Sequence, residues 1–235
     1  MGSARAIGFA VLAATMFGCG GPNHGGLPEL EGGAELALRR GAAWSTVKVR
    51  PPYAIGPRVN LHFFKKGMVS GNIDSGASMD PRVDPMGASM RPFAPSNSSG
   101  ALSLTIDEEG IQGEGPYGGV AVDVEESPDA LNFEGTWNGA RVTFNITTTT
   151  LKGTIPIRRI GRVDSVGGVT TCQYVLDHVA SDGAREGTSI CSGMPEQTRL
   201  EIPRQVDAWL TRKELVVVLL ALLSTPPQGS LEPLP

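Results

Sequence analysis

The sequence that decides the fold is LNFEGTWNGARVTFNI, residues 131–146. Asn138 and Gly139 at its centre both tolerate positive φ, which favours the two-residue type I′ turn of a β-hairpin. Such a turn sets four pairs opposite each other: Trp137 and Ala140, Gly135 and Val142, Phe133 and Phe144, Leu131 and Ile146. The other face then carries the polar side chains of Glu134, Arg141, Thr143 and Asn145. Because a shift of one residue would invert the two faces, the agreement between turn and pattern predicts this hairpin.

The same alternation of apolar and polar residues extends over residues 101–157, with turn signals between the alternating runs. An earlier stretch, residues 59–73, alternates in the same way on both sides of a turn at Lys66-Gly67. We expect about eight strands before residue 160, most of them separated by short turns. The four threonines at 147–150 either form a tight turn or continue one long strand. The pattern predicts a mainly β fold, an antiparallel meander that forms a curved sheet or a small barrel.

Glycines stand inside three of the expected strands, at Gly113, Gly135 and Gly153. A glycine within a strand often marks a sharp bend or a close approach of two backbones. We therefore expect a strongly curved sheet, which favours a barrel or half-barrel over a flat sheet.

The periodicity changes near the C-terminus, where Thr211 and Glu214 fit the capping box of a helix. Apolar residues fill positions 215–223, and Pro226-Pro227 ends the helix. This apolar run is about 14 Å long as a helix, about half of a bilayer core, so we do not expect a membrane span. A helix that is apolar on every side must be buried. We expect it to lie against the apolar face of the sheet or to close one end of it; contact with a partner or a membrane surface is the alternative.

The N-terminus has the pattern of an export signal, with Arg5 followed by a short apolar stretch at residues 7–17. The stretch ends in Gly18-Cys19, which resembles the lipobox of bacterial lipoproteins, where a cysteine after a small residue is acylated. The resemblance implies that residues 1–18 are a signal peptide and that Cys19 carries lipid. Gly20 follows the cysteine, which in the enterobacterial sorting rule indicates the outer membrane. A plain secretory signal, leaving the protein secreted or periplasmic, is the alternative.

Two further cysteines, Cys172 and Cys191, form an even pair in this exported protein, which indicates a disulfide. Closing that loop would stabilise the fold by about 3 kcal/mol on the chain-entropy model. A metal pair would need further ligands nearby, and only His178 is close in sequence. We therefore expect neither a metal ion nor a cofactor.

These features divide the chain into four predicted parts. Residues 1–18 are the signal peptide, and residues 19–44, which begin rich in glycine, are a flexible tether. The β-meander domain covers residues 45–165 and includes a long irregular loop at 74–100. Residues 166–235 are expected to form a disulfide-closed segment and the C-terminal helix packed on the sheet.

Composition excludes several classes of protein. The formal net charge of −4 gives no basic footprint for nucleic acid. A hydrophobic content of 40% with 31 glycines and 18 prolines is unlike a coiled coil or a polytopic membrane protein.

One short motif indicates chemistry. The segment Ile-Asp-Ser-Gly-Ala at 73–77 resembles the active-site motif of retroviral-type aspartic proteases. The resemblance implies that Asp74 would share a proton with a second aspartate from a partner subunit. Asp-Ser-Gly also commonly ends a strand, so a protease that uses Asp74 is kept only as the alternative function.

We therefore expect a non-catalytic lipoprotein of the cell envelope, attached to membrane lipid through acylated Cys19. Its domain would bind a small apolar ligand inside the curved sheet or contact an envelope protein. Small barrels characteristically enclose such ligands. An interior filled by side chains would count against a ligand inside the sheet.

Overall fold

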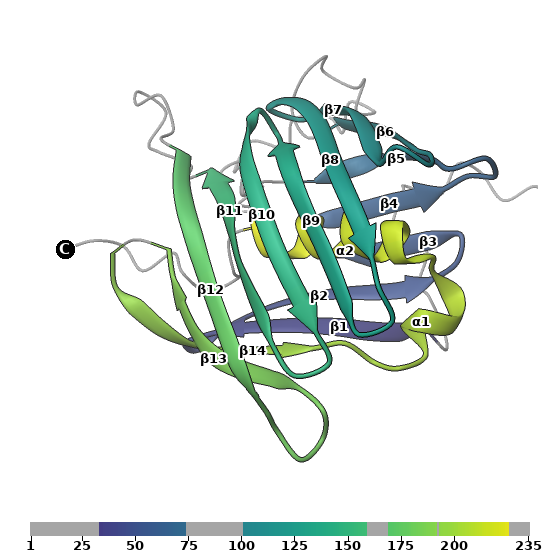
Figure 1. The fold of residues 1–235 in the computed structure, drawn as a ribbon. Helices are drawn as coiled ribbons and strands as arrows, with labels where there is room; N and C mark the ends of the chain where they lie inside the picture. The colour runs from purple at the N-terminus through teal and green to yellow at the C-terminus, as the bar shows by residue number, and fades with distance from the viewer. Residues whose placement is uncertain (1–32, 74–100, 159–168, 192, 226–235) are drawn as a thin grey trace, which may run out of the picture.

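The computed structural model describes residues 33–73, 101–158, 169–191 and 193–225. Within them, fourteen antiparallel strands form one closed barrel (Figure 1). The strands are β1 (Ala34–Arg40), β2 (Ala43–Arg50), β3 (Tyr53–Gly56), β4 (Val59–Phe63), β5 (Met68–Ile73), β6 (Ala101–Ile106), β7 (Ile111–Gly115), β8 (Gly118–Glu126), β9 (Ala130–Trp137), β10 (Ala140–Thr147), β11 (Leu151–Arg158), β12 (Val169–Val179), β13 (Arg185–Ile190) and β14 (Pro195–Glu201).

Each strand pairs with the next along the chain, which is the predicted meander. The barrel closes because the first strand, β1, also pairs with the last, β14. In that pair Ala37 lies opposite Glu201, and Arg40 lies opposite Thr198. The predicted fold class, mainly β with an antiparallel barrel, is therefore confirmed.

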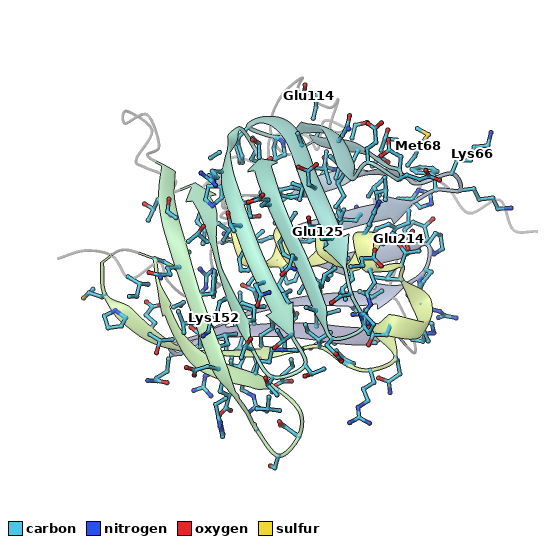
Figure 2. All side chains as sticks on the ribbon, viewed as in Figure 1. Lys66, Met68, Glu114, Glu125, Lys152 and Glu214 are labelled. Atoms are coloured by element: carbon cyan, nitrogen blue, oxygen red, sulfur yellow. A yellow bond between two sulfur atoms is a disulfide. The ribbon has the colours of Figure 1, made fainter. Side chains whose placement is uncertain are left out.

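The hairpin of β9 and β10 has the predicted register. Trp137 faces Ala140, Phe133 faces Phe144, and the remaining predicted pairs follow in step. Asn138 and Gly139 adopt φ angles of 53° and 77°, as a type I′ turn requires. The apolar side chains of this hairpin face the barrel interior. Outward-facing side chains on neighbouring strands, such as Glu125 and Lys152, project from the wall (Figure 2).

The four threonines form a turn between β10 and β11, which settles the alternative left open by the sequence. The Thr147 amide donates to the Thr150 carbonyl oxygen at 2.8 Å. The Thr147 hydroxyl accepts a hydrogen bond from the Thr150 amide at 2.9 Å. Side-chain hydrogen bonds of this kind let threonine close a turn without glycine.

The strand glycines lie where neighbouring backbones approach closely, as expected. Gly113 and Gly135 both have φ of +144°, a conformation that residues with a Cβ rarely adopt. A Cβ at Gly135 would lie 2.1 Å from the carbonyl oxygen of Ala121 on β8. At Gly153 the obstacle is the ring of Phe144 on β10, 2.3 Å from the position of a Cβ.

The barrel extends beyond the predicted domain at both ends of the sequence. The predicted tether at 19–44 is too long, because β1 and the first residues of β2 belong to the wall. The predicted segment at 166–235 contributes three strands of that wall, β12 to β14. Eleven described strands precede residue 160, where about eight were expected. The predicted signal peptide and the loop at 74–100 lie outside the described residues.

Two of these strands, β1 and β14, escaped prediction because their sequences lack strict alternation, whereas β12 does alternate, with Cys172, Tyr174 and Leu176 buried. β1 buries three consecutive residues, Leu36, Ala37 and Leu38. β14 contains one aliphatic residue, Leu200, among charged and polar neighbours. Pairing with adjacent strands, rather than a local pattern, holds such segments in the sheet.

Helix α2 (Arg212–Ser224) begins as predicted, with a capping box. The Thr211 hydroxyl accepts from the Glu214 amide at 3.2 Å, and the Glu214 carboxylate accepts from the Thr211 amide at 2.8 Å. From Leu215 to Ser224 every residue is buried. The helix runs through the barrel between its front and back strands and contacts β2, β4, β9 and β11 (Figure 1). It therefore lies against the apolar inner face of the sheet rather than closing one end.

A one-turn helix, α1 (Val206–Trp209), joins β14 to α2. No local sequence pattern indicated this helix. Neither helix in the described residues has the length and apolar character needed to cross a membrane.

Candidate functional site

Strand β1 begins at the same end of the barrel at which α2 enters, and we call this the entry end. The hairpin turns at residues 127–129, 148–150 and 180–184 lie there. Lys213 in the first turn of α2 donates hydrogen bonds to the carbonyl oxygens of Asp107 and Glu108, in another turn at this end. The opposite end, which contains the Cys172–Cys191 disulfide, we call the disulfide end.

A cavity of about 390 Å³ opens at the entry end between α2 and the wall. Its apolar lining includes Leu131 on β9, Ile146 on β10, and Leu215 and Leu219 on α2. Leu219 is fully buried and Ile146 is 7% exposed, so the cavity reaches the barrel core. This mouth cavity combines an apolar floor with an opening to solvent.

Three arginines line the mouth cavity: Arg185, Arg204 and Arg212. They reach it from three different elements, the start of β13, the link after β14 and the start of α2. The charged lining also includes two carboxylates, Asp129 and Asp207. Cationic groups therefore exceed anionic groups by one at this cavity.

Arg185 is the most enclosed of these arginines. Its Nη2 donates to the carbonyl oxygen of Thr147 at 2.8 Å, which fixes the guanidinium at the cavity. Its Nε is buried and has no hydrogen-bond partner among the described residues. Burial lowers the pKa of the Arg185 guanidinium below its ordinary value, and the charge of Asp207 acts in the opposite direction. Arginine nevertheless stays charged in proteins, so a buried donor is available here.

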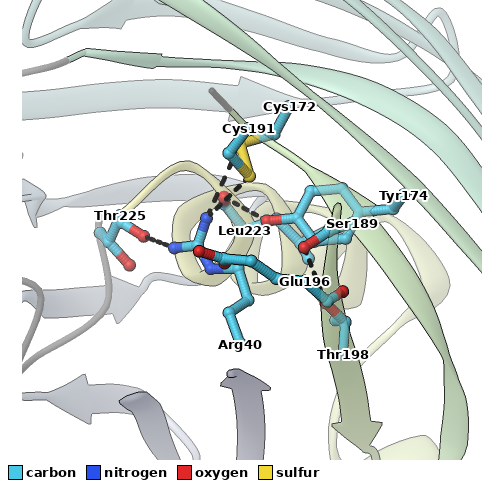
Figure 3. The surroundings of a disulfide bond; sticks show 9 residues. All are labelled: Arg40, Cys172, Tyr174, Ser189, Cys191, Glu196, Thr198, Leu223 and Thr225. Atoms are coloured by element: carbon cyan, nitrogen blue, oxygen red, sulfur yellow. Dashed lines mark hydrogen bonds between the residues drawn. A yellow bond between two sulfur atoms is a disulfide. The ribbon is translucent and has the colours of Figure 1, made fainter. Parts of the chain in front are cut away.

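The disulfide end is held together by side chains that bind the C-terminus of α2. The predicted bond between Cys172 and Cys191 is present (Figure 3). Arg40, only 3% exposed, donates from Nη2 to the carbonyl oxygen of Thr225 at 2.7 Å. The other terminal nitrogen of Arg40, Nη1, lies 3.4 Å from the sulfur of Cys191. A cation beside the C-terminal carbonyl groups of a helix is stabilising.

Two more buried groups secure the same helix end. The Tyr174 hydroxyl donates to the carbonyl oxygen of Leu223 at 3.3 Å (Figure 3). Burial raises the pKa of the Tyr174 phenol, which keeps it protonated as a donor. Trp137 donates from its indole nitrogen to the Ser224 hydroxyl at 3.3 Å. We interpret the disulfide end as structural, because Arg40, Tyr174 and Trp137 all bind the C-terminus of α2. Arg40 Nε and Asn138 Oδ1 are nevertheless buried without a hydrogen-bond partner among the described residues.

The structure brings together only one pair of the residues singled out from the sequence, Cys172 and Cys191. Cys19 and Asp74 lie outside the described residues. His62 lies on the outer side of the wall between Tyr53 and Phe64, with ring centroids 4.6 and 3.9 Å away. No group of three His, Cys, Asp or Glu in the described ranges is placed to hold a metal ion.

Sequence reasoning missed the mouth cavity and its arginines. The three arginines stand in three separate segments, and no spacing between them indicates that they meet. The only local feature that relates two of them is the short segment between β14 and α2. This segment contains Arg204 and ends just before Arg212. Comparison with known proteins gave no matching family model, no similar curated protein and no similar solved structure.

Proposed function

We propose that this protein is a non-catalytic lipoprotein of the cell envelope that binds a small, largely apolar ligand in its mouth cavity. Acylated Cys19 would attach it to a membrane, with the outer membrane as the expected site. The observation that carries the binding proposal is the cavity itself. Its volume of about 390 Å³ falls within the range of roughly 300–1,000 Å³ typical of small-molecule sites.

The position of α2 decides where such a ligand would lie. The helix occupies the barrel interior, and its residues from Val216 to Leu223 are fully buried. A ligand in the centre of the barrel would have to displace this helix. At the entry end, by contrast, apolar side chains already border open space, so binding needs no rearrangement of the core.

The expected lipid anchor also favours a binding site at the entry end of the barrel. The chain that leads from Cys19 joins the wall at Ala34, at the start of β1 and therefore at the entry end. Fully extended, residues 20–34 span at most about 50 Å. An acylated Cys19 would therefore keep the start of β1, at the entry end of the barrel, within that distance of the membrane surface, where apolar ligands are concentrated.

Filling the cavity is expected to abolish ligand binding. Ile146 lies on its floor, and Ile146→Trp places a larger side chain in the space that the ligand would occupy. The measurement is the fluorescence of N-phenyl-1-naphthylamine, an uncharged apolar probe, titrated with the purified full chain. We expect saturable binding by the native protein and about tenfold or weaker binding by Ile146→Trp, equivalent to about 1.4 kcal/mol.

Thr143→Trp is the matched control, because Thr143 lies on the same strand and faces solvent. It should bind the probe like the native protein, and circular dichroism should show both variants folded. Absence of probe binding by the native protein, or equal binding by Ile146→Trp, would contradict the proposal.

A further inference from the structure

Building on the proposed function, we infer that the ligand is an amphiphile: one apolar chain that carries an anionic carboxylate or phosphate head group. Arg185, Arg204 and Arg212 would bind the head group at the opening of the mouth cavity. The apolar chain would extend inward along Leu131 and Leu219, which lie at its floor.

The charge of the cavity lining is opposite to that of the whole chain. The protein has 24 acidic and 20 basic residues and a formal net charge of −4. At the mouth cavity three arginines face two aspartates. Such a local reversal favours an anionic ligand, because a cluster of cations attracts negative charge more strongly in a concave apolar setting than on open surface.

These arginines differ from a structural arginine at the same end of the barrel. Arg199 forms ion pairs with three carboxylates, those of Asp182, Glu186 and Glu201. The guanidinium groups of Arg204 and Arg212 form no ion pair or hydrogen bond with any described residue, although the Arg204 backbone carbonyl accepts from the Asp207 amide. The described structure therefore leaves their donors available.

Arg185 provides the second, independent indication. A buried polar atom without a hydrogen-bond partner destabilises the fold, and Arg185 Nε is such an atom. Its Nη2 is already engaged by Thr147, so the guanidinium is held in place. An oxygen of a bound carboxylate or phosphate would give Nε the acceptor that it lacks. Asp207, which also acts on Arg185 electrostatically, would partly oppose the bound anion.

Arginine side chains are suited to bind an anionic head group of this kind. A guanidinium presents paired N–H donors in a plane, which match two oxygens of one carboxylate or phosphate. The apolar floor gives no partner to a second polar group at the far end of the ligand. A single chain with one anionic end meets both requirements.

The test compares four probes of this chemistry on the native full chain by isothermal titration calorimetry: decanol, decanoate, lysophosphatidylglycerol and inorganic phosphate. We expect the two anionic amphiphiles to bind at least about tenfold more tightly than decanol, since hydrogen bonds to charged groups are the strong ones. Inorganic phosphate should bind far more weakly than either. Tighter binding of lysophosphatidylglycerol would indicate a membrane lipid as source, and tighter binding of decanoate a free fatty acid.

The variants Arg185→Gln and Arg204→Gln, combined in one chain, should reduce the ratio of decanoate affinity to decanol affinity to about one. The ratio is the readout because both arginines line the cavity. Arg141→Gln is the matched control, because Arg141 lies on the outer face of β10 and does not line the cavity. It should retain the native preference for the anionic probes.

The outcomes separate this inference from the proposed function. Equal binding of decanol and decanoate, or an undiminished preference in the double variant, would contradict the inference of an anionic head group. Neither result would contradict the proposed apolar site. Binding of inorganic phosphate as tight as that of the amphiphiles would contradict the inference that the ligand binds through an apolar chain. Failure of all four probes to bind would contradict the proposed function itself.

Discussion

Replacing Val218 by aspartate is expected to leave the chain without a folded barrel. Val218 lies in the middle of α2 and is fully buried. The one buried arginine among the described residues, Arg40, binds the C-terminus of the helix, and the partly buried Arg185 lines the cavity near its start. Burying an unpaired carboxylate costs several kcal/mol even when it takes up a proton. Total stabilities are only about 5–15 kcal/mol, so this one substitution removes much or all of the stability.

The measurement is urea unfolding followed by near-UV circular dichroism, with tryptophans such as the buried Trp137 as reporters. Thr143→Asp introduces the same side chain on the exposed face of β10. It should change the free energy of unfolding by less than about 1 kcal/mol, the range of strand propensities. A Val218→Asp protein with a native midpoint would show that α2 is not the core of the barrel.

The second large effect is expected at Gly135. Its φ of +144° is unfavourable for any residue with a Cβ, and a Cβ would lie 2.1 Å from the Ala121 carbonyl oxygen. Gly135→Val therefore requires both a backbone change in β9 and a separation of β9 from β8. We expect a loss on the order of 2–5 kcal/mol, from backbone strain and overpacking together.

Gly119→Val on β8 provides the control, because nothing lies within 4 Å of a Cβ built there. Its melting temperature should stay within a few degrees of the native value, since surface substitutions usually change stability by about 0.5 kcal/mol or less. Thermal unfolding of both variants by circular dichroism is the measurement. Equal melting temperatures for the two variants would contradict the close packing of β8 and β9.

The sequence predicts those parts of the fold in which local pattern and tertiary structure agree. The hairpin around Asn138-Gly139 was predicted to the residue, because turn type and alternation select the same register. The helix start at Thr211 was predicted because the capping box is a local device. The disulfide followed from a count of cysteines.

The rest depends on contacts that no local pattern encodes. Closure of the barrel rests on the pairing of β1 with β14, and β14 contains only one aliphatic residue, Leu200. The mouth cavity arises where the ends of β9, β10 and β13 meet the start of α2. Arg185 and Arg212 line the same cavity only in the folded barrel, in which the strands surround α2.

The anchor and the ligand can be tested together by native mass spectrometry of the protein purified from its own membranes in mild detergent. We expect a chain that begins at Cys19 with covalent acyl groups, together with the non-covalent mass of one anionic amphiphile. That non-covalent mass should be absent from Ile146→Trp purified in the same way. A chain that begins elsewhere without lipid, and that carries no additional mass, would contradict both the anchor and the ligand.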